Sequence, residues 1–226
     1  MSRDGTKVKI CGIKEESTID GMKGLPVDYI GFVFAKSKRQ VSPERAAALL
    51  SLAAQTPMAG EAAPLSVGVF VNPTMEELEG ILSIAKLDVV QLHGGETPEF
   101  AKKVKERFGV KVWRALPMDE DCKESEGGGP SRLDAYRGIA DAVLIDTAGG
   151  GTGRTFRWDL IPSYRKAADT NGLQLFVAGG LSPDNVEELV GRYSPQGVDI
   201  SSGVETDGVK DTAKIAAFAK KARNKG

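Results

Sequence analysis

Five polar side chains that could exchange protons or bind a substrate occur where the sequence predicts strand ends. They are Cys11, Gln91, His93, Asp146 and Asp199. Cysteine, histidine and aspartate are residue types that take up and release protons in enzymes. Taken singly, each residue could equally well be a polar group of the core whose hydrogen bonds are satisfied. A lone cysteine in a strand is usually a small buried hydrophobic residue. Their shared position at strand ends is what favours a function.

Two glycine-rich turns in the C-terminal third are typical of anion binding. The stretch "VAGGLSPDN" spans 177–185 and "ISSGVE" spans 200–205, and each closes a predicted strand. Glycines let the backbone approach an anion, which N–H groups and a helix start then hold. The alternative is two turns that need glycine only for a positive φ angle. Their pairing predicts phosphate binding by Gly179, Gly180, Ser201, Ser202 and Gly203.

Two further loops stand out by their composition. The stretch "TAGGGTGRTF" at 147–156 is too long and glycine-rich for a plain connector and predicts a lid. It lacks the Lys-Ser/Thr pair of a nucleotide-binding P-loop. The polar, glycine-rich segment 119–132 predicts a mobile surface loop, and Cys122 within it is assigned no function.

The elements that must position these residues alternate between strand and helix. Strands are predicted at 7–11, 29–34, 65–71, 88–93, 110–116, 141–146, 173–179 and 197–202. The clearest helices are predicted at 42–54, 74–85, 97–108, 182–193 and 211–223, several with Ser, Thr or Asp at the start. This alternation indicates an α/β fold with parallel strands and right-handed crossovers.

Eight such units predict a single (β/α)₈ barrel over residues 1–226, in which the C-terminal ends of all strands meet at one mouth. A doubly wound open sheet is the alternative. However, the turn after the first strand, "CGIKEES", lacks the G-x-G-x-x-G of a dinucleotide-binding sheet. The barrel is therefore the better interpretation.

Composition excludes several classes of function. Thirty basic and 31 acidic residues give a net charge of −1, so neither nucleic acid nor a membrane surface is expected as a partner. No apolar run approaches 18 residues, and the N-terminus lacks the apolar region of a signal peptide. Two cysteines and one histidine form no metal-binding pattern, so we expect no metal, no cofactor and a cytoplasmic location.

Longer motifs now support a family. They are "KICGI", "GFVFAKSKRQVSP", "VGVFVN", "DVVQLHGGETPEF", "LIDT", "GGTGRTFRW", "VAGGLSPDNV", "VDISSGVE" and "GVKD", which run in order from residue 9 to 211. With these motifs the sequence resembles the phosphoribosylanthranilate isomerases of tryptophan biosynthesis. The resemblance implies a (β/α)₈ barrel and an Amadori rearrangement of N-(5-phosphoribosyl)anthranilate, an aminoaldose, to the aminoketose 1-(2-carboxyphenylamino)-1-deoxyribulose 5-phosphate.

The resemblance also implies residue roles. Cys11 of "KICG" takes the place of the general base, Asp146 of "LIDT" that of the general acid, and Arg39 holds the anthranilate carboxylate. Gln91, His93 and Asp199 are expected to bind substrate, with no cofactor, in a monomer or homodimer. The sequence departs from the family at Lys38 and Gln40, where proline and tyrosine are common, and at Arg157, where an acidic residue is usual.

The chemistry leaves some assignments open. A nearby cation would favour a Cys11 thiolate, and Lys9 is one candidate, although it is equally well explained as the structural partner of Asp199. Rival functions on the same scaffold are an indole-glycerol-phosphate synthase, a ribulose-phosphate epimerase and a non-catalytic barrel that binds phosphorylated metabolites. The sequence does not exclude activity on the histidine-pathway aminoaldose, which undergoes the same rearrangement.

Overall fold

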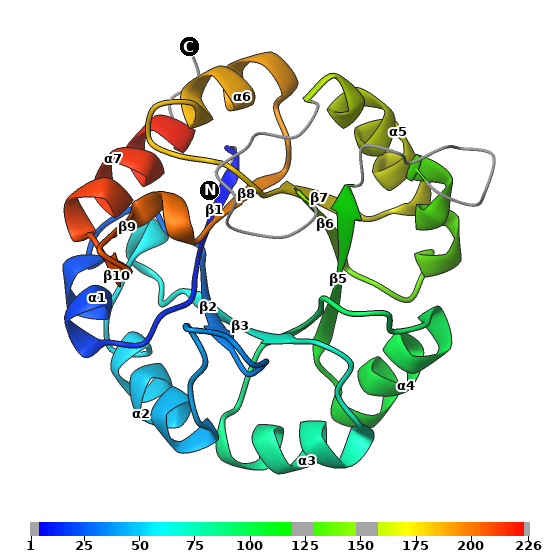
Figure 1. Ribbon diagram of the computed structural model, residues 1–226, viewed down its shortest axis with the longest axis horizontal. Coiled ribbons are helices and arrows are strands. Elements are labelled where there is room, and N and C mark those ends of the chain that lie inside the picture. Colours follow the sequence, from blue (N-terminus) through cyan, green and yellow to red (C-terminus); the bar gives the residue numbers. More distant parts are fainter. Residues whose placement is uncertain (1–4, 119–128, 148–157, 224–226) are drawn as a thin grey trace.

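Eight parallel strands close into a barrel in the computed structural model, which describes residues 5–118, 129–147 and 158–223 (Figure 1). The strands pair in chain order, and β1 pairs with β8 to close the ring. Their bounds are Lys7–Cys11 (β1), Tyr29–Val33 (β2), Leu65–Phe70 (β3), Val89–Leu92 (β4), Lys111–Met118 (β5), Ala142–Thr147 (β6), Gln174–Val177 (β7) and Gly197–Ile200 (β8). The closed ring confirms the (β/α)₈ barrel and rules out the open sheet.

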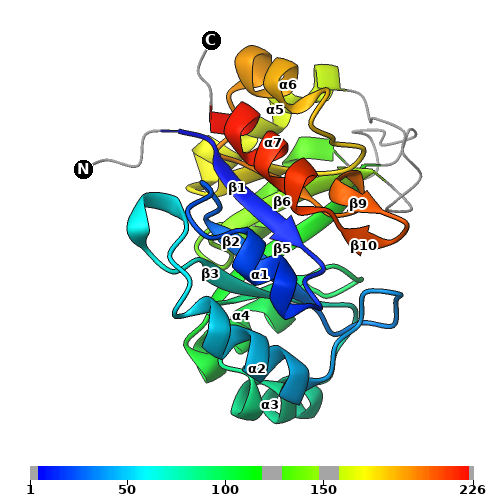
Figure 2. The same ribbon diagram turned by 90° about the vertical axis from the view of Figure 1, so that its left-hand side faces the viewer.

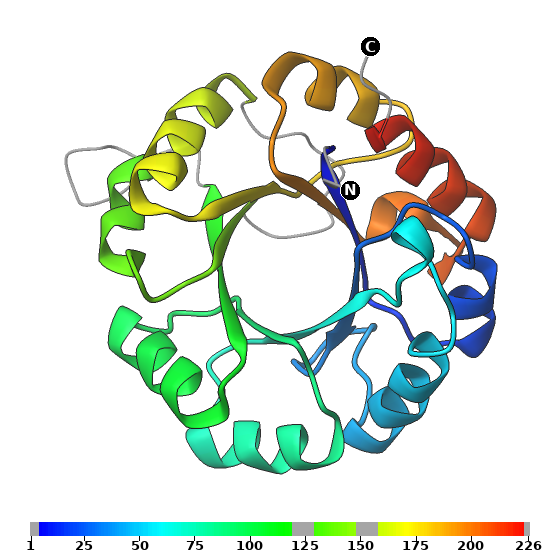
Figure 3. The same cartoon turned by 180° about the vertical axis from the view of Figure 1, so that it is seen from behind.

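Helices surround the barrel on all sides (Figure 3). They are Glu16–Gly21 (α1), Pro43–Ala53 (α2), Met75–Ile84 (α3), Pro98–Phe108 (α4), Ile161–Asn171 (α5), Val186–Tyr193 (α6) and Thr212–Arg223 (α7). Between β5 and β6 the described residues contain the 3₁₀-helix Gly129–Tyr136 in place of an α-helix. The residues 129–132, expected to end a surface loop, begin this 3₁₀-helix, whereas 119–128, with Cys122, lie outside the described residues.

Local sequence signals explain where the helices begin. The side chains of Ser42, Thr74 and Thr97 cap α2, α3 and α4 by accepting hydrogen bonds from backbone N–H groups. The helix expected from residue 182 begins only at Val186, because Ser182 and Asn185 form a turn in which the Ser182 N–H donates to Asn185 Oδ1. This turn follows the glycines that end β7.

Two layers of apolar side chains hold the barrel together. Inside the ring, Tyr29, Trp113 and Phe176 pack with ring centroids 4.3–5.7 Å apart, together with small and branched residues from other strands. Outside the ring, a larger buried cluster fills the space between strands and helices. The interior is therefore filled with side chains, as expected for an eight-stranded barrel. One cavity lies at the C-terminal ends of the strands, and another is lined by residues at their N-terminal ends, including Lys7 and Lys111.

A small hairpin lies beyond the end of β8. It consists of β9 (Glu205–Thr206) and β10 (Val209–Lys210), which pair antiparallel just before α7. Figure 2 shows it on the side of the barrel where β1 ends. Among the helices of the described residues, none combines the length and apolar character needed to cross a membrane. The expected lid at 147–156 falls almost entirely outside the described residues, as does Arg157.

Candidate active site

A cavity of about 260 Å³ lies at the C-terminal ends of the strands. Every candidate site residue from the sequence borders it. These residues are Cys11, Arg39, Gln91, His93, Asp146, Gly179, Gly180, Asp199, Ser201, Ser202 and Gly203. They come from β1, β4, β6, β8 and the loops after β2, β7 and β8. The alternation of β and α units thus brings residues from the whole length of the chain to one mouth.

Cys11 is the last residue of β1 and is buried, with its thiol beside Gly31 of β2. A Cβ atom on Gly31 would lie 2.8 Å from Cys11 Sγ, so glycine at this position makes room for the sulfur. Burial raises the pKa of Cys11 above its ordinary 9.0, although the ammonium groups of Lys9 and Lys210 oppose the shift. At neutral pH the free protein therefore carries Cys11 as a thiol, and the positive charges of Lys9 and Lys210 act on it.

Lys9 and Asp199 form a buried ion pair across the seam between β1 and β8. Lys9 Nζ lies 2.9 Å from Asp199 Oδ1, and the Lys9 side chain has no exposed surface. Burial is the largest single effect and lowers the pKa of Lys9, but the charges of Asp199 and Cys11 and the hydrogen bonds to them together outweigh it, so the pKa is raised. Lys9 is thus the structural partner of Asp199 and at the same time a cation close enough to Cys11 to act on the thiol.

Asp146 near the end of β6 faces His93, which follows β4. His93 Nε2 lies 3.8 Å from Asp146 Oδ2, and the Asp146 side chain is 15% exposed. Gln91, two residues before His93, is buried on the same side of β4, and its Oε1 has no hydrogen-bond partner among the described residues. A buried acceptor without a partner is costly, and a hydroxyl group of a bound sugar would satisfy it.

A buried ion pair holds the loop that carries His93. The Arg114 guanidinium on β5 donates to the carbonyl groups of Leu92 and Gly94 and to Glu96 Oε2. Glu96 in turn accepts from the N–H of Gly94. The backbone on both sides of His93 is therefore fixed by one charged network, a role that the sequence analysis did not assign to either residue.

The two glycine-rich turns lie against each other at the cavity. Gly179 and Gly180 both have positive φ angles, +85° and +62°, which other residues rarely adopt. A Cβ atom on Gly203 would lie 2.0 Å from the Leu181 carbonyl oxygen, so the two turns touch backbone to backbone. Close contact of this kind leaves N–H groups accessible to an anion without side chains in the way.

Arg39 reaches the cavity but already has a partner. Its Nε and Nη2 donate to the two carboxylate oxygens of Glu205 over 2.6 and 2.8 Å. Glu205 also accepts from Lys210 Nζ over 2.9 Å. Sequence reasoning singled out neither Glu205 nor Lys210, although the stretch "ETDGVK" is a hairpin signal that places the two opposite each other. It also missed Lys36, an exposed residue that borders the cavity.

The two departures near Arg39 have different surroundings. The Lys38 side chain is exposed, and its carbonyl accepts from Lys14 Nζ. The Gln40 side chain donates to the Phe34 carbonyl and closes the base of the loop that carries Arg39. Gln40 therefore stabilises this loop through its own hydrogen bond, at a position where tyrosine is common in the family.

No group of three or more metal-ligand side chains occurs within the part of the chain that the structure describes. What the cavity offers is a thiol, two carboxyl groups, an imidazole and the cationic side chains of Lys36 and Arg39. Such a set can move protons on a bound substrate.

Comparison with known proteins points to one family. Residues 8–221 match the family model of N-(5'-phosphoribosyl)anthranilate (PRA) isomerase. An N-(5'-phosphoribosyl)anthranilate isomerase of Brevibacillus brevis is 46% identical over 222 residues, covering 96% of this chain and 94% of the relative. A solved structure of monomers generated from the dimeric isomerase of Thermotoga maritima is 34% identical, with a TM-score of 0.73 and coverage of 96% and 98%. Another solved isomerase is 34% identical, with a TM-score of 0.74 and the same coverage, and holds reduced 1-(o-carboxyphenylamino)-1-deoxyribulose 5-phosphate.

Proposed function

Because the chain belongs to the N-(5'-phosphoribosyl)anthranilate isomerase family, we propose that Cys11 is its general base and Asp146 its general acid. The chain is an isomerase of tryptophan biosynthesis that converts an aminoaldose to an aminoketose by acid–base catalysis. The observation that supports the two assignments is their placement at one cavity, Cys11 on β1 and Asp146 on β6.

The rearrangement sets requirements that these two groups meet. Opening of the furanose ring needs a proton on the ring oxygen, which a protonated Asp146 supplies. The Schiff base that results acidifies the hydrogen on carbon 2 of the sugar. Cys11 removes this hydrogen as a proton, in the thiolate form that remains after the thiol proton has passed to solvent. The enolamine then tautomerises to the ketone, and Asp146 regains a proton from solvent, so that the net reaction only relocates hydrogen within the substrate. The steps balance without an oxidant, and we propose no cofactor.

Cations around Cys11 support its role as the base. In the free protein burial outweighs the charges of Lys9 and Lys210 and the pKa of Cys11 is raised, but these charges reduce the free-energy cost of forming the thiolate. Ser201 Oγ donates to the Cys11 carbonyl over 3.1 Å, and Lys210 Nζ donates to the Ser201 carbonyl over 2.8 Å. These contacts tie the end of β1 to the loop after β8 and keep the sulfur at the cavity wall.

The anionic ends of the substrate need anchors on either side of the reacting carbons. We assign the phosphate to the backbone of Gly179, Gly180 and the turn 201–203, and the anthranilate carboxylate to Arg39. Gln91, His93 and Asp199 then border the sugar between these anchors. Holding both ends in this way places carbon 2 and the ring oxygen near their proton-transfer groups.

The proposal also covers the substrate class, the domain organisation, the oligomeric state and the location of the protein. The substrate is a small phosphorylated molecule, and we propose that residues 1–226 form one catalytic barrel that acts as a monomer or homodimer in the cytoplasm. Support for the oligomeric forms comes from the Thermotoga maritima relative, which is described as a dimer converted to monomers. A non-catalytic phosphate-binding barrel would need the two glycine turns but neither Cys11 nor Asp146.

Replacement of the sulfur tests the proposal. Cys11→Ser keeps the size of the side chain but raises the pKa of the group far above neutrality, so kcat should fall by ~10²–10⁴ with little change in KM. The fluorescence of the anthranilate group follows the turnover. Cys122→Ala serves as the matched control and should retain full activity. A folded Cys11→Ala protein with full turnover would exclude Cys11 as the base.

A further inference from the structure

The hairpin after β8 is built to place two charged side chains opposite each other. Its turn is Asp207–Gly208, and both residues have positive φ angles, +52° and +79°. Two such residues form the tight turn that matches the twist of paired strands, which fixes the register of the hairpin. In that register Glu205 of β9 lies directly across from Lys210 of β10. Lys214 Nζ of α7 adds a hydrogen bond to the Glu205 carbonyl over 3.0 Å.

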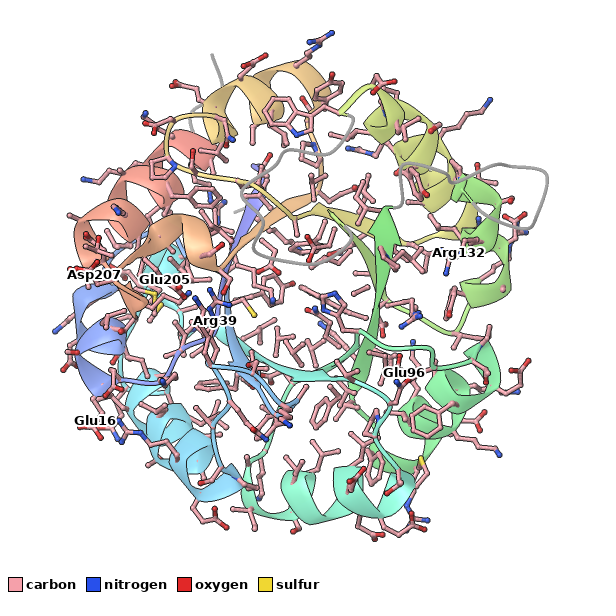
Figure 4. The ribbon with its side chains drawn as sticks, in the orientation of Figure 1. Glu16, Arg39, Glu96, Arg132, Glu205 and Asp207 are labelled. Carbon is pink, nitrogen blue, oxygen red and sulfur yellow. The ribbon has the colours of Figure 1, made fainter. Side chains whose placement is uncertain are left out.

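Glu205 links this hairpin to Arg39. Both Glu205 oxygens accept from Arg39, one from Nε and one from Nη2, and Lys210 Nζ donates to Oε1. The three side chains are 6%, 19% and 4% exposed in the order Glu205, Arg39, Lys210. Figure 4 shows Arg39 and Glu205 side by side at the mouth of the barrel. A bidentate, largely buried pair of this kind restricts the guanidinium to one orientation.

The contact uses only one edge of the guanidinium. Nε and Nη2 donate to Glu205, whereas Nη1 has no hydrogen-bond partner in the part of the chain that the structure describes. The edge formed by Nη1 and Nη2 can therefore bind a second carboxylate. Gly12 allows the Arg39 stem to lie against the end of β1, since a Cβ atom there would be 2.5 Å from Arg39 Cδ. The side chain is thus fixed from two directions and still borders the cavity.

The cluster formed by Arg39, Glu205 and Lys210 carries one net positive charge. Arg39 and Lys210 contribute two positive charges and Glu205 one negative charge, which leaves a net charge of +1. One substrate carboxylate would neutralise this excess, whereas a ligand without a carboxylate would leave it unpaired. The cluster therefore favours an anionic aromatic ring over a neutral one of the same shape.

We propose that Glu205 is a positioning residue that orients Arg39, so that the free edge of the guanidinium meets the carboxylate of the substrate. The inference rests on the proposed role of Arg39 as the carboxylate anchor. Glu205 is not among the residues that line the cavity, whereas Arg39 is, so we expect Glu205 to act on the substrate through Arg39. Its effect is to pre-organise Arg39, which reduces the conformational freedom that substrate binding must remove. The alternative is that Glu205 competes with the substrate for Arg39, in which case its removal would tighten binding.

Two probes separate these outcomes. One is reduced 1-(o-carboxyphenylamino)-1-deoxyribulose 5-phosphate, and the other is the same compound without the carboxyl group. In Glu205→Gln, the dissociation constant of the first probe should rise about tenfold, within the range measured for residues that share one hydrogen-bond network. The second probe should bind equally to wild type and variant. The KM of the substrate should rise in parallel, with kcat nearly unchanged.

Further variants keep the test decisive. Glu205→Asp retains the charge but has a shorter side chain, so the dissociation constant of the first probe should rise for this variant too. This second variant provides the test if Glu205→Gln folds poorly. Glu16→Gln, on the outer surface beside Arg45, is the matched control and should change neither probe. In an Arg39→Ala background, Glu205→Gln should have no additional effect on the first probe, because no guanidinium remains to be oriented.

The following results would overturn the proposal or its premise. Unchanged or tighter binding of the first probe to Glu205→Gln overturns the positioning role, as does equal weakening of both probes. If Arg39→Ala leaves the first probe unaffected, the premise about Arg39 fails first. If Arg39→Ala weakens the first probe and Glu205→Gln does not, only the positioning role fails.

Discussion

His93 Nε2 lies 3.8 Å from Asp146 Oδ2, across the ends of β4 and β6. Burial is the main cause that lowers the pKa of His93 below its ordinary 6.5, so the imidazole is neutral at pH 7. A protonated histidine would hold the carboxyl group in its ionised form. A neutral one imposes no such charge on Asp146, the residue that we propose as the general acid.

Loss of the acidic proton at position 146 should affect the chemical step. We expect Asp146→Asn to lower kcat by ~10²–10⁴ with little change in KM, because the amide keeps the shape but cannot protonate the ring oxygen. Turnover is measured by the fluorescence of the anthranilate group. Asp169→Asn, on the exposed side of α5, is the control and should retain the wild-type kcat. An Asp146→Asn enzyme with the wild-type kcat would remove Asp146 from the mechanism.

The thiol of Cys11 should react only at high pH in the free protein. Burial raises its pKa above 9.0 more than Lys9 and Lys210 lower it, and the thiolate fraction grows as pH rises toward the pKa. In a Cys122→Ala background, the rate of alkylation by iodoacetamide should increase with pH to a midpoint above 9.0. Lys210→Met removes a cation and should move the midpoint higher, whereas Lys102→Met on the surface of α4 should not. A midpoint below 9.0 contradicts the expected direction.

Inorganic phosphate should compete with the substrate at the glycine turns. Gly203→Ala would place a Cβ atom 2.0 Å from the Leu181 carbonyl oxygen and force the two turns apart. We expect this variant to raise both the KM of the substrate and the inhibition constant of phosphate. Gly191→Ala is the matched control, since nothing lies within 4 Å of its Cβ position in α6, and it should stabilise the fold by ~0.5–1 kcal/mol. Purely non-competitive inhibition would refute the phosphate assignment.

The Arg39–Glu205 pair should show itself in the pH dependence of stability. Burial alone would raise the pKa of Glu205, but hydrogen bonds from Arg39 and Lys210 lower it from 4.5 to about 2. A depressed folded-state pKa gives stabilisation that is complete above 4.5 and is lost as pH falls toward 2. The free energy of unfolding of wild type minus that of Glu205→Gln should therefore shrink over this window in urea titrations. Glu79→Gln, whose partner Arg107 is exposed, should give a small difference throughout. A pH-independent difference for Glu205→Gln would contradict the shift.

The barrel could be predicted from the sequence because each strand is a short β-rich run with turn residues on both sides. Predicted and observed strands agree closely except at β5, β7 and β8. β5 runs on to Met118, while β7 and β8 each end two residues earlier than expected. The shortening of β7 has a physical reason, since Gly179 and Gly180 leave the strand conformation through positive φ angles. A run of apolar residues up to a glycine does not reveal on which residue the backbone turns.

The site residues at strand ends were predictable for the same topological reason. Parallel strands end at one mouth, so Cys11, His93 and Asp146 had to meet there once the barrel was assumed. The pairing of Arg39 with Glu205 was not predictable in this way. The two residues are 166 positions apart, Arg39 on the loop after β2 and Glu205 in the hairpin after β8, so the order of the barrel strands does not show that they meet. The same applies to Arg114, a strand residue whose guanidinium turns out to fix the loop around His93.

The seam between β1 and β8 also bears on the order in which the chain folds. Lys9 and Asp199 are 190 residues apart, and a buried ammonium group without its partner is strongly unfavourable. During synthesis from the N-terminus, Lys9 must therefore stay hydrated until β8 has emerged, which makes ring closure a late event. Pulse-labelled hydrogen exchange during refolding should find the β1 amides protected after those of β3 and β4. Early protection of β1 would contradict this order. Until closure, β1 remains an open edge that other chains can pair with.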